Sequence, residues 1–472
     1  MSDYTPVEVI LKVLKRLPVK SLVRFRSVCK SWNTLICNQS FIAAHLQATP
    51  NNTSFLLLAC LKKYRVNYSL HYDKAGFGKF KHLQFPKFDY NAADSAVVGS
   101  CNGLICVQLF YHGEFDFYFV LWNPAILKYT YLPELSVSED DDLNTGFGFD
   151  STTNDYKLLV VGVDKSGSWI QPYLFSLNGS SWKRITATPP NYAIGPDASM
   201  PFVSGALHWL GYQERNAGEF SHAILGFHLS TEEFLVINLP NNLTGFRPLG
   251  LSIMKYGESS IALSIDPGRG ELHELWVMKE YGVVQSWTKV LALDGFRPGA
   301  CIPRVLGFRQ NGEVLLRVRK VKMASLDLNS QQMGDSLYLN SQQIELHGVD
   351  VGEDLLSVYS YAESLVLLDK PVDVSSESDD YYHIVSSDSD ELNWGESYFN
   401  LARDSSDSDE LSGGESYFNL ARDSSDSDEL SGGESDDWIP RNLADTQAIE
   451  ACLPAEPPLG VFSLSCTAFF FF

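Results

Sequence analysis

The chain has 472 residues, of which 44% are hydrophobic, and a formal net charge of −22 at pH 7. This length allows two or three domains of about 150 residues each, and the apolar content is ordinary for a protein with a buried core. No stretch approaches the about 20 uncharged residues of a membrane-spanning helix, and Lys12, Lys15 and Arg16 interrupt the apolar residues that a signal peptide would need. We therefore expect no membrane association, and a cytoplasmic or nuclear location.

The charge divides the chain into three parts. Residues 373–438 hold 20 Asp and Glu against two Arg, so about −18 of the net charge lies in this segment. The first 46 residues run the other way, with seven Lys and Arg against two acidic residues. A basic head, a nearly neutral body and an acidic tail predict three segments with different tasks. We place these segments at residues 1–47, 52–370 and 371–472.

Residues 5–46 predict three short amphipathic helices. Thr5 can cap a helix whose apolar residues recur at helical spacing through Val7–Leu17, and Pro18 ends it. The second helix, from about Ser21, has the apolar set Leu22, Phe25, Val28, Cys29 and Trp32. A third helix is predicted near Ser40–Leu46. Because about 40 residues bury little surface by themselves, we expect the apolar faces to continue into a partner protein.

The body from Asn52 to about Asp369 has the pattern of strands and turns. Short runs rich in Val, Ile, Leu and aromatic residues alternate with Gly, Asn, Asp, Ser and Pro. Asn102-Gly103 and Asn311-Gly312 are typical of hairpin turns. The clearest predicted strands are Ala96–Val98, Leu104–Leu109, Tyr118–Trp122, Lys157–Val161, Tyr173–Leu177, Ala206–Leu210, Ile224–Leu229, Leu275–Met278 and Val314–Val318.

A loose repeat runs through this body. Four units begin at Leu121, Leu174, Phe227 and Leu275, and each consists of an apolar strand, a polar turn and a second strand. The spacing of about 50 residues is close to the kelch period, and such repetition suits the blades of a β-propeller. We therefore predict a small all-α N-terminal domain followed by a mostly β domain, a kelch-like β-propeller. A β-sandwich and an imperfect propeller are the alternatives.

The tail contains a repeat with a period of 19 residues. The sequence SSDSDEL begins at Ser386, Ser405 and Ser424, and the many acidic residues, serines and glycines predict disorder. Ser406 and Ser425 each have an aspartate three positions on, the spacing that acidophilic kinases favour, so both are candidate phosphosites. One interpretation of the tail is a passive solvated segment. The alternative is a phosphorylatable segment that clamps a basic substrate or competes with other partners for the basic head.

No motif in the body indicates catalysis or metal binding. Gly99–Gly103 has a Gly-x-Cys-x-Gly spacing, but the apolar run after it is typical of a strand rather than the helix that a nucleophile elbow requires. The histidines, His208 among them, and the eight cysteines show no metal-ligand spacing. The acidic tail would repel phosphate. We expect no cofactor, no metal and no nucleic-acid partner.

The N-terminal block resembles the F-box, the docking motif by which an adaptor joins a cullin-based ubiquitin ligase of the SCF type. The resemblance rests on Pro6–Ile10, Leu14, Arg16–Leu22, Arg24–Trp32 and Phe41, and Thr5 departs from the usual leucine. It implies that the helices bind a Skp-type adaptor and, through it, cullin. The implied adaptor contacts, for which packing among the helices is the alternative, are Pro6, Val7, Ile10, Leu11, Leu14, Leu17, Pro18, Leu22, Phe25, Val28 and Trp32.

The body is similar to the F-box-associated domain of plant F-box proteins, a group that includes kelch-like and S-locus F-box proteins. The ordered matches are Ser100–Cys106, Leu121–Pro124, Gly146–Asp150, Gly205–Trp209 and Trp276–Gly282. The resemblance implies a non-catalytic substrate receptor that holds an unknown target protein for ubiquitination. The alternatives are a propeller enzyme or glycan-binding protein, and a scaffold acting outside ubiquitination. A pollen S-locus role is a further alternative within the family.

Overall fold

The computed structural model describes residues 7–48 and most of residues 55–370. The gaps fall at 63–64, 75–76, 85–91, 112–117, 136, 138–141, 165–168, 195–199, 217–218, 241–242, 244–249, 267–272, 294–303, 319–321, 329–343 and 348–353. The predicted disordered tail, with Ser406 and Ser425, lies outside the described residues, and so does Pro6.

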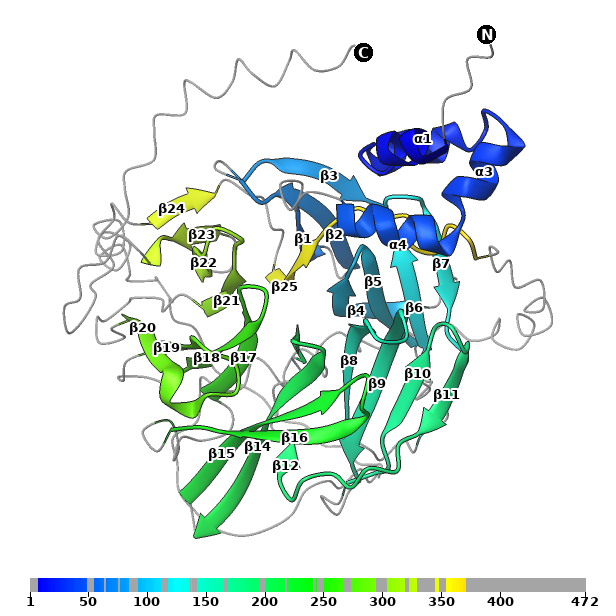
Figure 1. The fold of residues 1–472 in the computed structure, drawn as a ribbon. Helices are drawn as coiled ribbons and strands as arrows, with labels where there is room; N and C mark the ends of the chain where they lie inside the picture. Colours follow the sequence, from blue (N-terminus) through cyan, green and yellow to red (C-terminus); the bar gives the residue numbers. More distant parts are fainter. Residues whose placement is uncertain are drawn as a thin grey trace, which may run out of the picture. The chain divides into compact units, whose positions relative to one another are not determined.

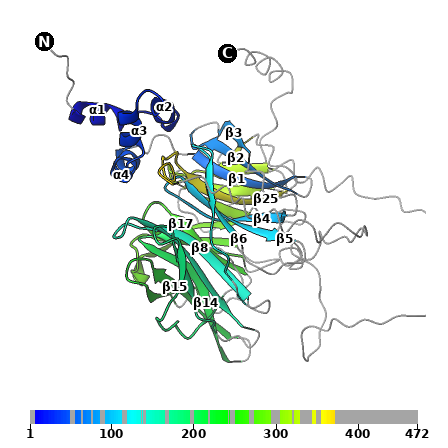
Figure 2. The same ribbon diagram turned by 90° about the vertical axis from the view of Figure 1, so that its right-hand side faces the viewer.

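Four helices form the N-terminal part and gather in one group (Figure 2). They are α1 (Val7–Leu14), α2 (Val19–Phe25), α3 (Lys30–Ile36) and α4 (Gln39–Ala48). The prediction of a single second helix was wrong, because the chain leaves helical geometry at Cys29, whose φ is −160° and ψ is 163°. The Phe25 and Trp32 rings, with centroids 5.4 Å apart, pack across the break between α2 and α3.

The body consists of six antiparallel sheets, which we number as blades 1 to 6 in chain order (Figure 1). Blade 1 contains β25 (Asp354–Tyr361), β1 (Phe55–Lys62), β2 (Arg65–Tyr72) and β3 (Lys79–Leu83); blade 2 contains β4 (Ala92–Cys101), β5 (Leu104–Tyr111), β6 (Tyr118–Asn123) and β7 (Lys128–Tyr131); blade 3 contains β8 (Asp142–Asp150), β9 (Asp155–Val163), β10 (Tyr173–Ser176) and β11 (Ser181–Arg184). Blade 4 contains β12 (Ala193–Ile194), β13 (Phe202–Val203), β14 (Ala206–Asn216), β15 (Glu219–His228) and β16 (Glu233–Asn238); blade 5 contains β17 (Leu251–Tyr256), β18 (Ser260–Ile265), β19 (His273–Met278) and β20 (Trp287–Leu293); blade 6 contains β21 (Arg304–Phe308), β22 (Val314–Val318), β23 (Lys322–Leu326) and β24 (Ile344–His347).

The sheets close into a ring, so the predicted β-propeller is confirmed. The first strands of successive blades touch one another, β4 against β8, β8 against β13 and β14, β14 against β17, and β17 against β21. The ring closes because β21 touches β25, and β25 touches β4. Strand β25 pairs with β1 over Phe55↔Tyr361 to Leu61↔Asp354, so the two ends of the body share blade 1 (Figure 1). This pairing removes the open edge that β1 would otherwise present.

Local sequence accounts for much of this architecture. The four repeat units recognised in the sequence are the last two strands of blades 2 to 5. Asn102-Gly103 forms the predicted hairpin, because Cys101 pairs with Leu104 and both turn residues have positive φ, 50° and 81°. Positive φ values at both central residues are typical of the type I′ turn, which matches the twist of the strands.

A buried ion pair joins blade 3 to blade 4. The Lys157 ammonium donates to Asp150 Oδ2 at 2.9 Å and to the Leu229 carbonyl oxygen at 2.7 Å. The side chains of Asp150 and Lys157 are 0% and 7% exposed. Thr152 and Thr153 also donate to the Asp150 carboxylate, so the buried charge is satisfied from several sides.

Acid titration of Asp150 gives a first prediction. Burial on its own would raise the pKa of this carboxyl, but hydrogen bonds from Lys157, Thr153 and Thr152 lower it from 3.8 to about 2. A carboxyl with a lowered folded-state pKa stabilises the fold above its unfolded pKa, and the contribution is lost as the pH falls toward the folded value. Between about pH 6 and about pH 3 the parent chain should lose roughly 1 kcal/mol more than Asp150→Asn. Urea unfolding at the two pH values measures this difference, and equal losses in both chains would contradict it.

A second buried cluster lies where blade 6 meets blade 1. The Arg309 guanidinium donates to Asp73 Oδ1 at 2.8 Å and to Glu313 Oε2 at 2.6 Å, and the Gln310 backbone N–H donates to Asp73 Oδ2 at 3.0 Å. The side chains of Arg309 and Asp73 are 1% and 3% exposed. Charged hydrogen bonds therefore supplement the β25–β1 pairing at the junction of blade 6 and blade 1, which we call the seam of the ring.

Candidate functional site

Helix α1 carries more apolar side chains than the rest of the described protein covers. At about 100° per residue, all its positions except Glu8 and Lys12 fall in one apolar stripe roughly 200° wide. One side of the stripe is covered by the rest of the protein, since Leu14 is buried and Ile10 and Leu11 pack against the core. Val9 and Val13, at the opposite edge of the stripe, are exposed by 47% and 55%, and Val7, at the N-terminal end of the helix, is exposed by 44%.

The predicted adaptor contacts divide into inner and outer residues. Leu14 and Leu22 are buried in the core cluster, and Ile10, Leu11, Leu17, Phe25 and Trp32 pack against it partly buried. Val7, Pro18 and Val28 are exposed, Val28 by 63%. The inner residues hold the helices together, and the outer residues are free to meet a partner. Val9 and Val13 were absent from the predicted set, although the apolar run Val7–Leu14 contained the signal for them.

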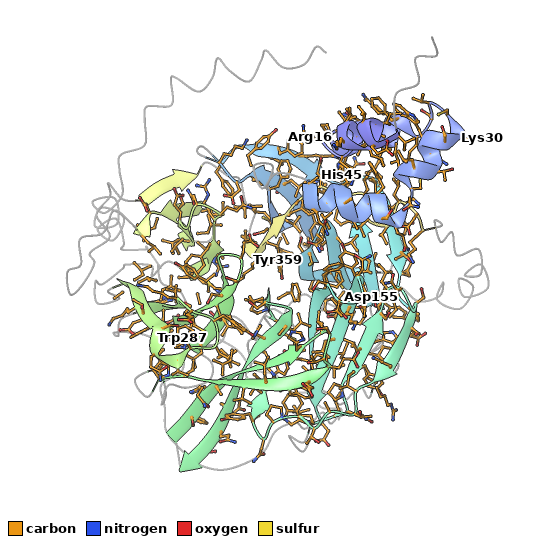
Figure 3. All side chains as sticks on the ribbon, in the orientation of Figure 1. Arg16, Lys30, His45, Asp155, Trp287 and Tyr359 are labelled. Carbon is orange, nitrogen blue, oxygen red and sulfur yellow. The ribbon has the colours of Figure 1, made fainter. Side chains whose placement is uncertain are left out.

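The helical group also carries exposed basic side chains. Arg16, Lys20, Arg24 and Lys30 are exposed on or beside the helices, and Figure 3 shows Arg16 and Lys30 on the outside of the helical group. Helix α4 is tied to the end of α1 through His45, whose buried Nε2 lies 2.9 Å from the Leu17 carbonyl oxygen. An apolar stripe with basic neighbours suits a partner that presents apolar and acidic groups.

A segment after β25, which we call the C-terminal strap (Ala362–Lys370), lies against blade 2. Asn123 is completely buried, and its Nδ2 donates to the carbonyl oxygens of Ser364 at 3.0 Å and Val366 at 2.8 Å. Lys128 Nζ donates to the carbonyl oxygens of Leu368 at 3.2 Å and Lys370 at 2.5 Å. Alternate carbonyl groups of the strap therefore accept hydrogen bonds from one turn of blade 2.

The strap also contacts the helical group. Gln39 Nε2 of α4 donates to Asp369 Oδ2 at 3.1 Å. Leu365 and Leu368 of the strap belong to the same hydrophobic cluster as Leu14 and Leu22 of the helices and Leu121 of blade 2. The helices and the propeller are therefore joined by a shared apolar core that includes the strap.

Strand direction shows which end of the propeller the strap covers. In an antiparallel blade, the hairpin between the first and second strands and the hairpin between the third and fourth lie at the same end. The strap contacts one hairpin of each kind, at Gly103 and at Asn123. The hairpins between the first and second strands of blades 2 and 3 are short. Two residues separate β4 from β5, and four separate β8 from β9. The connections between blades emerge at the opposite end and are longer, ten residues from β7 to β8 and twelve from β16 to β17.

The described residues give little support to catalytic chemistry. Burial raises the pKa of the Cys101 thiol to about 12, so this cysteine is a protonated thiol and a poor nucleophile. His208 is fully buried and its Nε2 lies 2.7 Å from the Tyr281 hydroxyl, and burial lowers its pKa to about 4. Ser264 Oγ lies 2.8 Å from His273 Nε2, and both residues are buried.

The described residues contain neither a metal-binding cluster nor a membrane-spanning helix. No group of three or more His, Cys, Asp and Glu side chains is arranged to hold a metal ion in the part of the chain that the structure describes. None of the helices described here has both the length and the apolar character needed to cross a membrane.

The comparisons with known proteins give one consistent result. A family model described as F-box domain matches residues 6–43, and one described as F-box associated beta propeller domain matches residues 55–368. An F-box/kelch-repeat protein of Arabidopsis thaliana is 29% identical over 305 residues, which cover 61% of this chain and 79% of that protein. An F-box protein of the same plant is 26% identical over 382 residues, which cover 71% of this chain and 87% of that protein. The first matched region ends within α4, and the second begins at the first residue of β1.

Proposed function

The chain belongs to the family of F-box proteins with an F-box-associated β-propeller domain, and we propose that it is the target-recognition subunit of an SCF-type ubiquitin ligase. In this proposal the F-box helices bind a Skp-type adaptor, which brings cullin, and the propeller binds a target protein in the cytoplasm or nucleus. The chain itself is non-catalytic. It accelerates transfer by holding the target close to the ubiquitin-charged enzyme.

The exposed apolar stripe of α1 is the observation that carries the proposal. Four of the large apolar side chains exposed among the described residues, Val7, Val9, Val13 and Val28, come from the helical part, although it is much shorter than the propeller. Clustered exposed apolar side chains mark interaction surfaces more than single ones do. The exposed basic residues of the same helical part would speed encounter with an acidic adaptor more than they add affinity.

We propose that the target binds at the end of the propeller that carries the connections between blades. The other end is partly covered by the strap and the helices that pack with it. The longer connections also offer more side chains than the tight hairpins do, and binding residues are often found on loops held by a rigid scaffold.

Adaptor binding provides the test of the proposed function. Val9→Asp combined with Val13→Asp would bring two unpaired carboxylates into the apolar contact, at a cost of about 3 kcal/mol or more. We expect roughly a 100-fold weaker Kd for a Skp-type adaptor, measured by titration calorimetry with the full chain. Removal of residues 1–46 should abolish co-purification with the adaptor.

The propeller offers a matched control for this pair. Val236 of β16 is also an exposed valine, at 41%, and Val236→Asp should leave the adaptor Kd unchanged. The proposed function would be overturned if the parent chain bound no Skp-type adaptor. An unchanged Kd in the Val9/Val13 variant would show that α1 does not form the contact.

A further inference from the structure

The turn Asn102-Gly103 of blade 2 fits closely against the C-terminal strap. Gly103 has a φ of +81°, and a Cβ at this position would lie 2.7 Å from the Ala362 carbonyl oxygen and closer still to the Ser364 hydroxyl. The glycine therefore serves two purposes, since it permits the turn and leaves room for the strap. Together with Asn123 and Lys128 it forms a bed for the strap, which begins where β25 ends and folds into turns over Leu365–Lys370.

The hydrogen bonds of this bed bridge distant parts of the chain. Asn123 and the strap residues that it binds are 241 and 243 residues apart in sequence. The Asn123 side chain is also fixed by the Ala125 backbone N–H, which donates to its Oδ1 at 3.0 Å. All the polar atoms of its amide group are thus used with one orientation of the side chain, which makes the contact specific in geometry.

The side chains of the strap pack on both the propeller and the helices. Leu365, Val366, Leu367 and Leu368 are exposed by no more than 9% and share one cluster with α1, α2, α3 and α4. Two domains joined only by a linker move relative to each other unless their interface is large and hydrophobic. The strap supplies apolar surface at this position.

We propose that the C-terminal strap is a spacer that fixes the F-box helices on the propeller, and that Asn123 is a positioning residue that locks the strap in place. Its consequence for ubiquitin transfer rests on the proposed function: a fixed F-box holds the bound target at a constant distance from the rest of the ligase. The strap would then act on transfer without contacting adaptor or target.

The two Asn-Gly turns of the chain provide a matched pair of variants. Gly103 and Gly312 both follow an asparagine and both have positive φ, 81° and 87°, but a Cβ at Gly312 would meet nothing within 4 Å. Gly103→Ala and Gly312→Ala therefore carry similar backbone strain, and only the first collides with the strap. Asn123→Leu removes the hydrogen bonds to the strap, and Asn178→Leu is its control in the exposed turn of blade 3.

The experiment measures the distance between nitroxide labels at Gln47→Cys on α4 and Val236→Cys on β16, after other accessible thiols are replaced by serine. In the full parent chain, Gly312→Ala and Asn178→Leu, we expect one narrow distance distribution. In Gly103→Ala and Asn123→Leu we expect it to broaden about twofold or more, because the interface that fixes the two domains is lost. Amides of the strap should exchange hydrogen roughly tenfold faster in these two variants, while those of β9 keep their protection.

Three outcomes would overturn the proposal. They are an equally broad distribution in the parent chain, an unchanged distribution in both Gly103→Ala and Asn123→Leu, and loss of amide protection in every blade, which would show a purely structural role. The label measurement uses no adaptor, so failure of adaptor binding would overturn the proposed function without affecting this result. The strap variants should still bind a Skp-type adaptor with the Kd of the parent chain.

Discussion

Lys157→Met is expected to destabilise the propeller by about 3 to 5 kcal/mol, because it leaves the Asp150 carboxylate charged in a site that is closed to water. The lost ammonium also satisfies the Leu229 carbonyl oxygen of the neighbouring blade, 2.7 Å away. The variant therefore weakens blade 3 and its contact with blade 4 at the same time. Guanidinium chloride unfolding followed by tryptophan fluorescence measures the loss.

An exposed ion pair in blade 5 is the control for this prediction. Lys255 lies 3.0 Å from Glu258, but the two side chains are 39% and 77% exposed. Lys255→Met should change stability by at most about 1 kcal/mol, since water replaces the partner of an exposed charge. The double variant Lys157→Met with Asp150→Asn should lose less than the sum of the two single losses. Equal effects of Lys157→Met and Lys255→Met would contradict the argument.

Arg309→Met is expected to open the seam between blade 6 and blade 1, with a loss of about 3 to 5 kcal/mol. It leaves Asp73 charged and 3% exposed, and it removes the hydrogen bond to Glu313. Because the seam is where β25 completes blade 1, hydrogen exchange should quicken first in β1 and β25 and later in β9. Arg309→Lys should fall between parent and Arg309→Met, since one ammonium cannot reproduce the geometry of the guanidinium.

Lys289→Met serves as the corresponding control at an exposed site. Lys289 pairs with Glu274 at 2.9 Å within blade 5, with side-chain exposures of 44% and 20%. Its loss should cost at most about 1 kcal/mol and leave exchange in β1 and β25 unchanged. Uniform acceleration of exchange in all blades of Arg309→Met would refute a special role for the seam.

Local patterns predict the hairpins well and the contacts between distant segments poorly. The Asn102-Gly103 turn is readable because both residues favour positive φ, and the structure confirms it. Asn123 is readable as a turn residue before Pro124, but its hydrogen bonds to Ser364 and Val366 depend on a segment more than 240 residues away. No residue spacing in the sequence indicates that Asn123 pairs with Ser364 and Val366.

The sequence also predicts only part of the structure of the N-terminal helices. Periodicity identifies the inner face of α1 through Ile10 and Leu14, but it passes over Val9 and Val13, which lie at the exposed edge of the same apolar stripe. The break before α3 also escapes detection, because neither glycine nor proline stands between Arg26 and Cys29. Whether the exposed valines bind an adaptor stays a prediction.

Blade 1 contains strands from both ends of the body, so one edge of β1 stays unpaired during synthesis until β25 has been made. Phe55 and its partner Tyr361 are about 300 residues apart, so β1 emerges from the ribosome long before β25 exists. At about 5 to 20 residues per second, the edge of β1 that β25 will cover waits roughly 15 to 60 s for its partner. An unpaired edge is a site for wrong pairing with other chains. A chain that stops before Asp354 would keep this edge open permanently, so even a late premature stop is expected to yield an aggregation-prone product rather than a shortened working propeller.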